Sequence, residues 1–454
     1  MLFTESKNTP SREPQKTHPF RLTLATRGVR YALLCLSLAL GGRYCVQAQS
    51  GYTITDLGVA GEWYSEAHGL NNNGWAVGEY EPGGALYQHS FIYNAQITSG
   101  LNLPPNNYDI AWGINDSNVI VGEYLPNPNP LTFYIEAYKY SNGVATGLGY
   151  LASINYSTAH GINRQGQIVG GSSTNSTGTV IHAVLWNTNG AKVDLGVLSG
   201  TYSSANAINN AGIIVGDSSV EGTTNTQAFI YTNTISPLGT LGGDYSSAKG
   251  INDAGVVVGE STEVTGGVTN LQAFIYRNGV MTSLRTQAAT LGADSSSASA
   301  INNLGQVVGY LGFGPSVIQA FLFDGTNIAN LNQFIPASSA FVSLASADGI
   351  NDKGQIIGSG TLTNGDYHGY LLTPLSSLKP FILLSAPGMI SGSGFQMTIE
   401  GLPGEQFVLQ ASTDLSSSNW VSLSTNVLTG FQTNYTDTDS SNWSTRYYRA
   451  LLLQ

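Results

Sequence analysis

Five tyrosines recur at the same place in a repeated segment and are the first candidates for contact with a ligand. Each stands three residues before a constant alanine: Tyr64, Tyr108, Tyr156, Tyr202 and Tyr245. Tyrosines gathered on one rim could stack against sugar rings, because the ring face is apolar and the hydroxyl can hydrogen-bond. They could equally pack between repeats with only their hydroxyls at the edge. The last two copies have Ser295 and Leu344 at this position.

The residue directly after the constant alanine is the one strand position that varies freely between copies. A fixed scaffold with one variable side chain per repeat is a way for a repeat protein to encode a ligand surface. A tolerant exposed position would look the same in the sequence, so both interpretations stay open. The seven residues are His68, Trp112, His160, Asn206, Lys249, Ser299 and Asp348.

A third recurring position, at the start of a later strand, holds three histidines and a glutamate among its seven residues. Both residue types can bind metals. Equivalent positions of different repeats usually lie far apart, however, so we interpret this set as structural hydrogen bonding and predict no metal site and no cofactor. The set is His89, Glu136, His182, Gln227, Gln272, Gln319 and His368.

The sequence contains none of the short motifs that mark common catalytic sites. The patterns G-x-S-x-G, H-E-x-x-H and G-x-x-x-x-G-K and the dinucleotide fingerprint do not occur in it. A channel can still gather catalytic residues from distant repeats, so this lowers the expectation of catalysis without removing it. We assign no catalytic residue and predict that the protein is not an enzyme.

These positions recur because the chain contains seven copies of a unit A-x-G/A-I/L-N-x-x-G-x-x-x-G. The shared asparagines are 44, 48, 46, 43, 50 and 49 residues apart. A period in the forties with only β-strand signals is typical of propeller blades, each made of four short strands. The asparagines are Asn71, Asn115, Asn163, Asn209, Asn252, Asn302 and Asn351.

Each unit predicts a β-hairpin. Small residues before the asparagine let neighbouring backbones approach, and the asparagine can begin a turn by bonding the backbone two residues further on. Three residues after it stands glycine in six copies and Asn118 in the other. Asparagine is the best substitute for glycine at positive φ, so we predict a left-handed residue there. The β-branched strand that follows is expected to end on the second constant glycine.

A third strand follows in every copy, and a weaker fourth strand follows in all but the last. The missing fourth strand has a counterpart at 52–58 (YTITDLG). An N-terminal strand that completes the last blade closes a propeller and covers its edge strands. We therefore predict an all-β chain with a seven-bladed β-propeller over 49–373, closed by its N-terminal strand. A linker at 374–380 and a small β-sandwich over 381–454 follow.

Residues 1–48 are predicted to be a secretory signal peptide. Scattered basic residues precede a short apolar run at 31–40 and small-residue cleavage chemistry at 46–48, which is the order that export signals share. The run is about half of the ~20 residues needed to span a bilayer; an uncleaved membrane anchor is the alternative. Both cysteines, Cys35 and Cys45, lie in this segment, so the mature chain is expected to have no disulfide.

Charge restricts the partners of the mature chain. Residues 1–48 hold seven of the 17 basic and two of the 28 acidic residues, which leaves ten basic residues, 26 acidic residues and a formal net charge of −16. Such a surface repels phosphate backbones and anionic lipids. We expect no nucleic-acid partner, no membrane insertion after signal cleavage, and a location outside the cell or at its surface.

The motif Y-S-x-A-x-G-I-N-x-x-G-x-V-V-G, with a following His/Gln-Ala-Phe strand, resembles the extracellular HAF-repeat family of bacteria. The best copies lie at 201–239 and 244–284, and the resemblance covers about 51–373. It implies export and repeat architecture, and no defined activity. The histidine of the His-Ala-Phe triplet is kept only in three copies. The tail, 381–454, is similar to C-terminal β-sandwich modules of secreted proteins from environmental bacteria.

These observations favour a secreted, non-enzymatic binding protein whose propeller face recognises a polysaccharide or a cell-surface protein. One alternative is a carbohydrate-active enzyme, a hydrolase or lyase, with acids gathered at the channel. It requires two carboxylates about 5–10 Å apart, and Asp348 is the only acid at the variable position. The other alternative is a structural envelope protein in which the propeller is a spacer and the tail docks to the surface.

Overall fold

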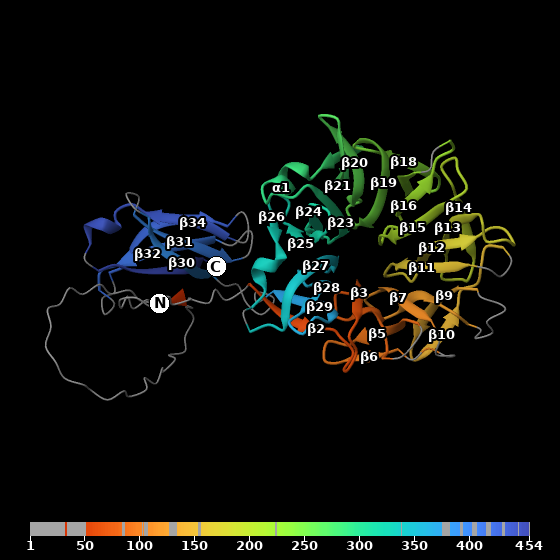
Figure 1. Cartoon of the computed structure of the whole chain (residues 1–454), viewed down its shortest axis with the longest axis horizontal. Coiled ribbons are helices and arrows are strands. Elements are labelled where there is room, and N and C mark those ends of the chain that lie inside the picture. The colour runs from red at the N-terminus through yellow and green to blue at the C-terminus, as the bar shows by residue number, and fades with distance from the viewer. Residues whose placement is uncertain are drawn as a thin grey trace. The chain divides into compact units, whose positions relative to one another are not determined.

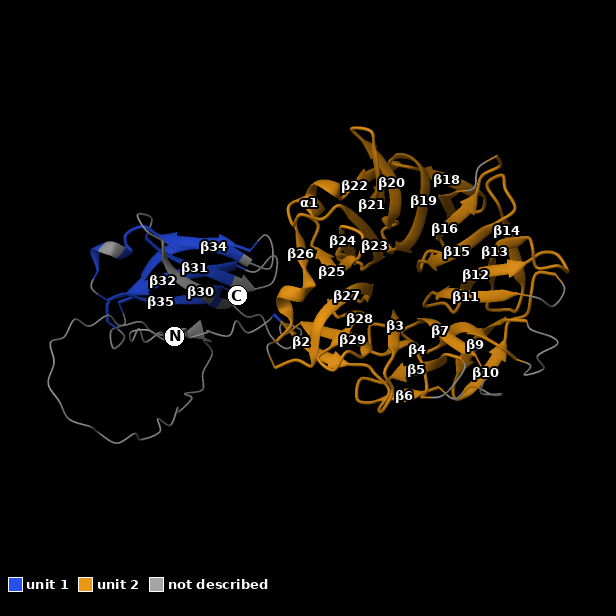
Figure 2. Ribbon diagram, viewed as in Figure 1, with its two compact units in different colours: residues 1–51, 375–454 blue, residues 52–374 orange. Residues whose placement is uncertain are grey.

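The computed structural model describes most of the chain beyond residue 50. The described residues are 32–33, 51–83, 87–101, 103, 108–126, 134–152, 156–222, 225–336, 338–374, 382–390, 394–401, 406–414, 419–428, 432–443 and 445–453. The chain divides into two compact units, one over 52–374 and one over 1–51 with 375–454 (Figure 2). No helix among these residues is long and apolar enough to cross a membrane.

The prediction of an all-β chain is confirmed. Within the described part of 52–374 the strands form seven antiparallel sheets of four strands each. Sheet 1 is β3 (Ser65–Leu70), β4 (Ala76–Tyr80), β5 (His89–Tyr93) and β6 (Thr98–Gly100). Sheet 2 is β7 (Asp109–Ile114), β8 (Ile120–Tyr124), β9 (Glu136–Ser141) and β10 (Val144–Gly147). Sheet 3 is β11 (Ser157–Ile162), β12 (Ile168–Ser173), β13 (Ile181–Trp186) and β14 (Lys192–Gly196).

The remaining sheets follow the same order. Sheet 4 is β15 (Ser203–Ile208), β16 (Ile214–Ser219), β17 (Thr226–Tyr231) and β18 (Ile235–Gly239). Sheet 5 is β19 (Gly242–Ile251), β20 (Val257–Thr265), β21 (Val268–Arg277) and β22 (Val280–Ser283). Sheet 6 is β23 (Ser295–Ile301), β24 (Val307–Phe313), β25 (Val317–Phe323) and β26 (Ile328–Asn330), with α1 (Arg285–Ala289) before it and the 3-10 helix η1 (Leu331–Phe334) after it. Sheet 7 is β27 (Phe341–Ile350), β28 (Ile356–Leu362), β29 (Tyr367–Pro374) and β2 (Tyr52–Asp56).

The sheets follow one another around a common centre, with the first strand of each sheet innermost (Figure 1). The constant asparagines tie these strands together. Asn71 Oδ1 accepts from the N–H groups of Asn73 and Trp75, both at 3.0 Å, which forms the predicted turn. Its Nδ2 donates to the backbone oxygen of Asn115 in the next sheet. All seven asparagines repeat this inter-sheet bond at 3.0–3.2 Å, and the last, Asn351, donates to Asn71.

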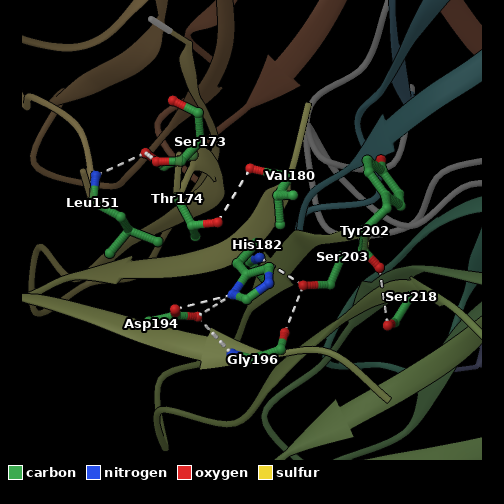
Figure 3. A network of polar contacts seen from close by, with 12 residues as sticks. Leu151, Ser173, Thr174, Val180, His182, Asp194, Gly196, Tyr202, Ser203 and Ser218 are labelled. Carbon is green, nitrogen blue, oxygen red and sulfur yellow. Dashed lines mark hydrogen bonds and ion pairs between the residues drawn. The ribbon is translucent and has the colours of Figure 1, made fainter. Parts of the chain in front are cut away.

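A serine that follows the recurring tyrosine position makes a second link between sheets. Ser203 Oγ accepts from the N–H of Ala183 in sheet 3 at 2.7 Å and donates to the oxygen of Gly196 at 2.6 Å (Figure 3). The equivalent serines of four other sheets accept a backbone N–H of the preceding sheet at 2.9–3.0 Å: Ser65, Ser157, Ser246 and Ser296. The Y-S-x-A motif therefore encodes contact between sheets.

Glycine is favoured at the two constant positions for different physical reasons. The first lies at positive φ, as at Gly74 (φ 80°), and Asn118 has φ 59° at this position, as predicted. The second glycine does not end its strand, which corrects the sequence interpretation: Gly78 lies inside β4. A Cβ added there would overlap the backbone oxygen of Glu66, and the six equivalent glycines are in the same situation. Close approach of the innermost strand requires glycine there.

Every innermost strand carries a β-bulge at the variable position. In sheet 1 the register with β4 shifts between Ala67 and Gly69, which leaves His68 as the extra residue. The same shift occurs in the other six sheets after the constant alanine. A bulge bends the strand and re-aims a side chain. The seven variable residues are therefore the seven bulged residues.

The N-terminal strand β2 is the fourth strand of sheet 7. It pairs antiparallel with β29 from Tyr52↔Pro374 to Asp56↔Tyr370. His368 Nδ1 lies 2.9 Å from Asp56 Oδ1, which also accepts the N–H of Gly58 at 2.8 Å. Sheet 3 has the same arrangement, in which His182, Asp194 and Gly196 take these three places (Figure 3). The segment 52–58 thus makes the contacts of a fourth strand.

The second unit also consists of antiparallel sheets. One contains β30 (Ile382–Ile390), β31 (Gly394–Gly401) and β34 (Gln432–Asp437), and the other contains β32 (Gln406–Ser412), β33 (Val421–Val427), β35 (Tyr447–Leu453) and the two-residue β1 (Ala32–Leu33). The 3-10 helix η3 spans Ser440–Asn442. Met397 and Ile399 of the first sheet share one core with Phe407 and Leu409 of the second. Apart from β1, the predicted signal peptide lies outside the described residues, as does the predicted linker beyond Pro374.

Candidate functional site

The innermost strands bring polar residues together at both of their ends. At the C-terminal ends lies a polar pocket of about 180 Å³. Each sheet contributes to it a leucine or isoleucine, the constant asparagine and the residue after that asparagine. We call this the axial pocket. The residues after the asparagines are Asn72, Asp116, Arg164, Asn210, Asp253, Asn303 and Asp352.

Hydrogen bonds between neighbouring sheets fix the polar groups of the axial pocket. Asn303 donates its backbone N–H to Asp352 Oδ1 at 2.9 Å and its Nδ2 to Oδ2 at 3.0 Å. Asn210 bonds Asp253 in the same way, with both distances 2.9 Å. Burial alone would raise the pKa of Asp253, but the bonds from Asn210 and the charge of Arg164 hold that pKa below its usual value. This carboxylate therefore stays ionised and can accept further hydrogen bonds.

A second group lies toward the N-terminal ends of the innermost strands, and the sequence analysis missed most of it. The residue after the second constant glycine, on the second strand, is acidic in sheets 1, 2, 4 and 5. In addition to burial, the charges of Glu66 and Glu123 help to raise the pKa of Glu79, that of Glu260 helps to raise the pKa of Asp217, and on the innermost strands that of Glu66 helps to raise the pKa of Asp348. Comparison of this column between the copies would have found them. The carboxylate group consists of Glu66, Glu79, Glu123, Asp217, Glu260 and Asp348.

In sheet 1, two of these acids, Glu66 and Glu79, meet the bulged residue His68 at one point. Each of Glu66, His68 and Glu79 has one potential ligand atom here, and the three atoms lie within 4.8 Å of one another. Burial raises the pKa of Glu79 to about 7, with contributions from the charges of Glu66 and Glu123. Burial also lowers the pKa of His68 to about 4, so its imidazole is neutral at neutral pH.

The other acids of the second strands have partners. Lys249 Nζ lies 2.8 Å from Glu260 Oε2 in sheet 5. Burial opposes the ionisation of Glu260, but the charge and hydrogen bond of Lys249, together with hydrogen bonds from Ser297 and Tyr245, keep the pKa of Glu260 below its usual value. In sheet 4, Asn206 Nδ2 donates to Asp217 at 3.0 Å, and in sheet 2 a tyrosine donates to Glu123.

The five tyrosines surround the carboxylate group. Tyr108 donates its hydroxyl to Glu123 at 2.6 Å, and Tyr245 donates to Glu260 at 2.9 Å. The Tyr64 hydroxyl bonds the carboxylates of sheet 1. Tyr202, with 37% of its surface exposed, is the most open of the five, and Tyr156 is half-buried. The hydroxyls of Tyr64, Tyr108 and Tyr245 thus point to carboxylates, whereas that of Tyr202 bonds Ser204.

The variable residues also contact one another or the adjoining sheet. The ring centroids of His68 and Trp112 lie 4.4 Å apart. Those of Trp112 and His160 lie 6.1 Å apart, and these two rings meet edge to face. Asn206 Nδ2 donates to the oxygen of Ala248 at 3.0 Å. Lys249 also bonds Ser297 Oγ, and Ser346 Oγ bonds Asp348. Ser299, the last member of the set, is half-buried.

The third recurring position makes local hydrogen bonds, in agreement with its structural interpretation. His182 Nδ1 lies 2.9 Å from Asp194 (Figure 3), and His89 Nδ1 lies 3.0 Å from Asp109. Glu136 accepts the N–H of Gly149 at 3.0 Å. The polar side chains of these three residues therefore bond groups of the same sheet or of the next one.

Comparison with known proteins adds a family match over part of the chain. Residues 239–377 match a family described as a protein of unknown function, DUF3466. A search of the curated proteins found no match.

Several solved structures are similar in fold. The β-propeller domain of the Trilobed protease from Pyrococcus furiosus is 10% identical, with 68% of this chain and 94% of that chain covered and a TM-score of 0.43. An acylaminoacyl peptidase from Pyrococcus horikoshii is 11% identical, with 75% and 58% covered and a TM-score of 0.40. TolB from Acinetobacter baumannii is 13% identical, with 66% and 80% covered and a TM-score of 0.37.

Proposed function

We propose that this protein is a secreted binding protein without catalytic activity, and that its axial pocket takes one sugar residue of a polysaccharide or a cell-surface glycan. The axial pocket carries the proposal. Its volume of about 180 Å³ is on the scale of a single sugar ring, and the residues after the constant asparagines line it with three amides, three carboxylates and one guanidinium. Sugar hydroxyls both donate and accept, so a ring of Asn and Asp side chains can bond several of them at once.

The charge of the pocket restricts the class of polysaccharide. Three carboxylates and one guanidinium line it, and the predicted mature chain carries a net charge of −16. Like charges repel an anionic polymer before it reaches the pocket. The ligand of this proposal is therefore a neutral or cationic polysaccharide. Export rests on the order of basic, apolar and small residues in 1–48, and N-terminal sequencing of the secreted protein is expected to begin at Gln49.

The test is affinity electrophoresis of the purified chain in gels that contain a neutral, a cationic or an anionic polysaccharide, with reducing ends measured in parallel. We expect retardation by a neutral or cationic polymer and no new reducing ends. Asp352→Asn is expected to weaken retardation, whereas the control Glu221→Gln, an exposed acid outside the pocket, is expected to leave it unchanged. Retardation by the anionic polymer alone, or by none, would contradict the proposal.

One observation favours the enzyme alternative. Oxygens of Glu66 and Glu79 lie within 4.8 Å of each other, and the pKa of Glu79 is raised to about 7. Retaining glycosidases use two carboxyl groups about 5 Å apart, one of them an acid with a raised pKa. New reducing ends that disappear in Glu79→Gln and persist in Asp352→Asn would establish this function in place of the first.

We also propose that the seven sheets are the blades of one propeller closed by β2. The proposal is supported by the pairing of β2 with β29 and by the hydrogen bond from Asn351 to Asn71. Removal of 49–58 from the mature chain takes away the buried Tyr52 and Leu57. We expect the melting temperature to fall by about 10 °C, and a synthetic peptide of 49–58 to restore part of it. An unchanged melting temperature would mean that this strand does not close the ring.

A further inference from the structure

The three side chains that meet in sheet 1 are placed by the strand register. Glu66 on β3 and Glu79 on β4 are direct cross-strand partners. His68 follows two residues after Glu66 and is the bulged residue of β3. All three therefore extend to one side of the sheet, where one ligand atom from each lies within 4.8 Å of the others.

This arrangement is unfavourable in the protein alone. Like charges directly opposite each other on neighbouring strands repel. Glu79 is only 8% exposed, and its Oε2 is buried without a hydrogen-bond partner. His68 Nε2 is likewise buried and unpartnered. Among the described residues, no lysine or arginine forms an ion pair with either glutamate.

The equivalent positions of the other sheets do not repeat this set. Sheet 5 has Glu260 at the place of Glu79, and the ammonium of Lys249, at the bulge, lies 2.8 Å from it. In sheet 4 the bulged Asn206 donates to Asp217. There the bulged residue supplies a donor or a cation to the buried acid. In sheet 1 the Tyr64 hydroxyl bonds the carboxylates, but the bulge supplies an imidazole and the facing strand supplies a second carboxylate, and both are acceptors for a cation from solution.

We propose that Glu66, His68 and Glu79 bind one divalent transition-metal cation, and that zinc fits this site. Zinc takes imidazole nitrogen and carboxylate oxygen at about 2.0–2.2 Å, with four ligands in all. Adjustments of about an ångström bring the three atoms to such distances. Two carboxylates and a neutral imidazole balance the charge of the cation, and the ring of Trp112 against His68 orients the imidazole. A fourth position is left for water or a ligand group.

This site is separate from the axial pocket, since it lies toward the N-terminal ends of the innermost strands and shares no residue with that pocket. Its test therefore stands apart from the polysaccharide test. This set was not predicted from the sequence, in which the third recurring position was the metal candidate considered among the repeats. The metal set combines a variable residue with two acids on adjacent strands of a single sheet.

The first experiment measures zinc binding to the untagged mature chain. The protein is freed of metal with a chelator, titrated with zinc by calorimetry, and its retained zinc is counted by mass spectrometry after gel filtration. We expect one zinc per chain. His68→Gln and Glu79→Gln should each weaken binding by at least about tenfold, while His182→Gln, a histidine beside an aspartate outside this site, should leave it unchanged. No retained zinc, or equal loss in His182→Gln, would overturn the proposal.

A second experiment places residue 68 at the metal directly. Cobalt(II) added to the metal-free chain should give visible absorption bands of a site with nitrogen and oxygen ligands. In His68→Cys the thiolate would bind the cobalt and add an intense near-ultraviolet sulfur-to-metal charge-transfer band. A folded His68→Cys protein that takes up cobalt without this band would show that residue 68 is not a ligand, and would overturn the proposal.

Discussion

Sheets 1 and 5 bury a glutamate at the same point of the second strand, and the two glutamates have opposite properties. Burial raises the pKa of Glu79 to about 7, whereas for Glu260 the effect of burial is outweighed by Lys249 together with the hydrogen bonds from Ser297 and Tyr245, which keep its pKa below the usual value. Both sheets share the pairing register around the second constant glycine and the bulge on the first strand. They differ in the bulged side chain, which is His68 in sheet 1 and Lys249 in sheet 5, and in the residue opposite the glutamate, which is Glu66 in sheet 1 and Ser247 in sheet 5.

The comparison shows how this repeat can change the chemistry around a buried acid while it keeps the same hairpin. In sheets 1 and 5 the pairing register and the bulge bring the bulged side chain close to the buried acid. The bulged residue and the residue opposite the acid then decide whether that acid is ionised and paired, as Glu260 is, or raised in pKa and open to a cation, as Glu79 is. The predictions below exchange these features between the two sheets.

The largest effect on stability is expected from Lys249→Met, which removes the ammonium that pairs with Glu260 in sheet 5. Loss of one partner of a buried ion pair costs roughly 3–5 kcal/mol, and because the Lys249 side chain is 31% exposed we expect a loss of about 3 kcal/mol at pH 8. Urea unfolding measures it. Adding Glu260→Gln should recover much of the loss. A single variant as stable as the parent would show that the pair does not stabilise the sheet.

Glu79→Gln should change the stability in the opposite direction from Lys249→Met, making the protein more stable at pH 8. The folded-state pKa of Glu79 is raised from 4.5 to about 7, so its contribution to stability is complete below pH 4.5 and is lost as pH rises through 7. Glutamine copies the neutral acid. In the presence of a chelator we expect the variant to be about 2 kcal/mol more stable than the parent at pH 8 and no more stable at pH 4. Free energies of unfolding at both pH values measure this.

The matched control for that variant is Glu260→Gln in sheet 5. The folded-state pKa of Glu260 is lowered, so its contribution is present above its unfolded pKa and is lost as pH falls through the folded value. This variant should therefore be less stable than the parent at pH 8. If both glutamine variants were destabilised equally, the two sheets would not differ in the way described.

The smallest effect is expected from His68→Lys, which gives sheet 1 the bulged residue of sheet 5. An ammonium at this position can pair with Glu79 as Lys249 pairs with Glu260, but the contact with the Trp112 ring is lost. We expect a gain of about 1 kcal/mol at pH 8 in chelator, together with loss of zinc binding. A destabilised variant would indicate that the packing of His68 outweighs its electrostatic surroundings.

Much of the fold could be predicted from the sequence because its causes are local. Asn71 bonds the backbone two residues further on, as expected, and Asn118 takes the left-handed conformation predicted for its position. The bond from each asparagine to the next sheet was not predicted, since it depends on how the innermost strands meet around the centre. Gly78 was interpreted as the end of a strand, and its actual role, to let β3 approach, appears only in the packed sheet.

The candidate sites show the same division between local and tertiary causes. The variable residues were found because they stand in one column of the repeat, but Glu79 stands 13 positions after Glu66 and became its neighbour only through the register of β3 and β4. The axial pocket needs three residues from each of seven sheets.

The sequence by itself determined the seven-fold repeat, the all-β class and the hairpin turns, because asparagine, glycine and β-branched residues act on their own backbone and immediate neighbours. Only the tertiary structure decided which polar side chains meet, which acid is buried with a cation and which is buried beside another acid. Register, bulge and burial set those distances, and the free energy of a charge depends on its surroundings over several ångströms.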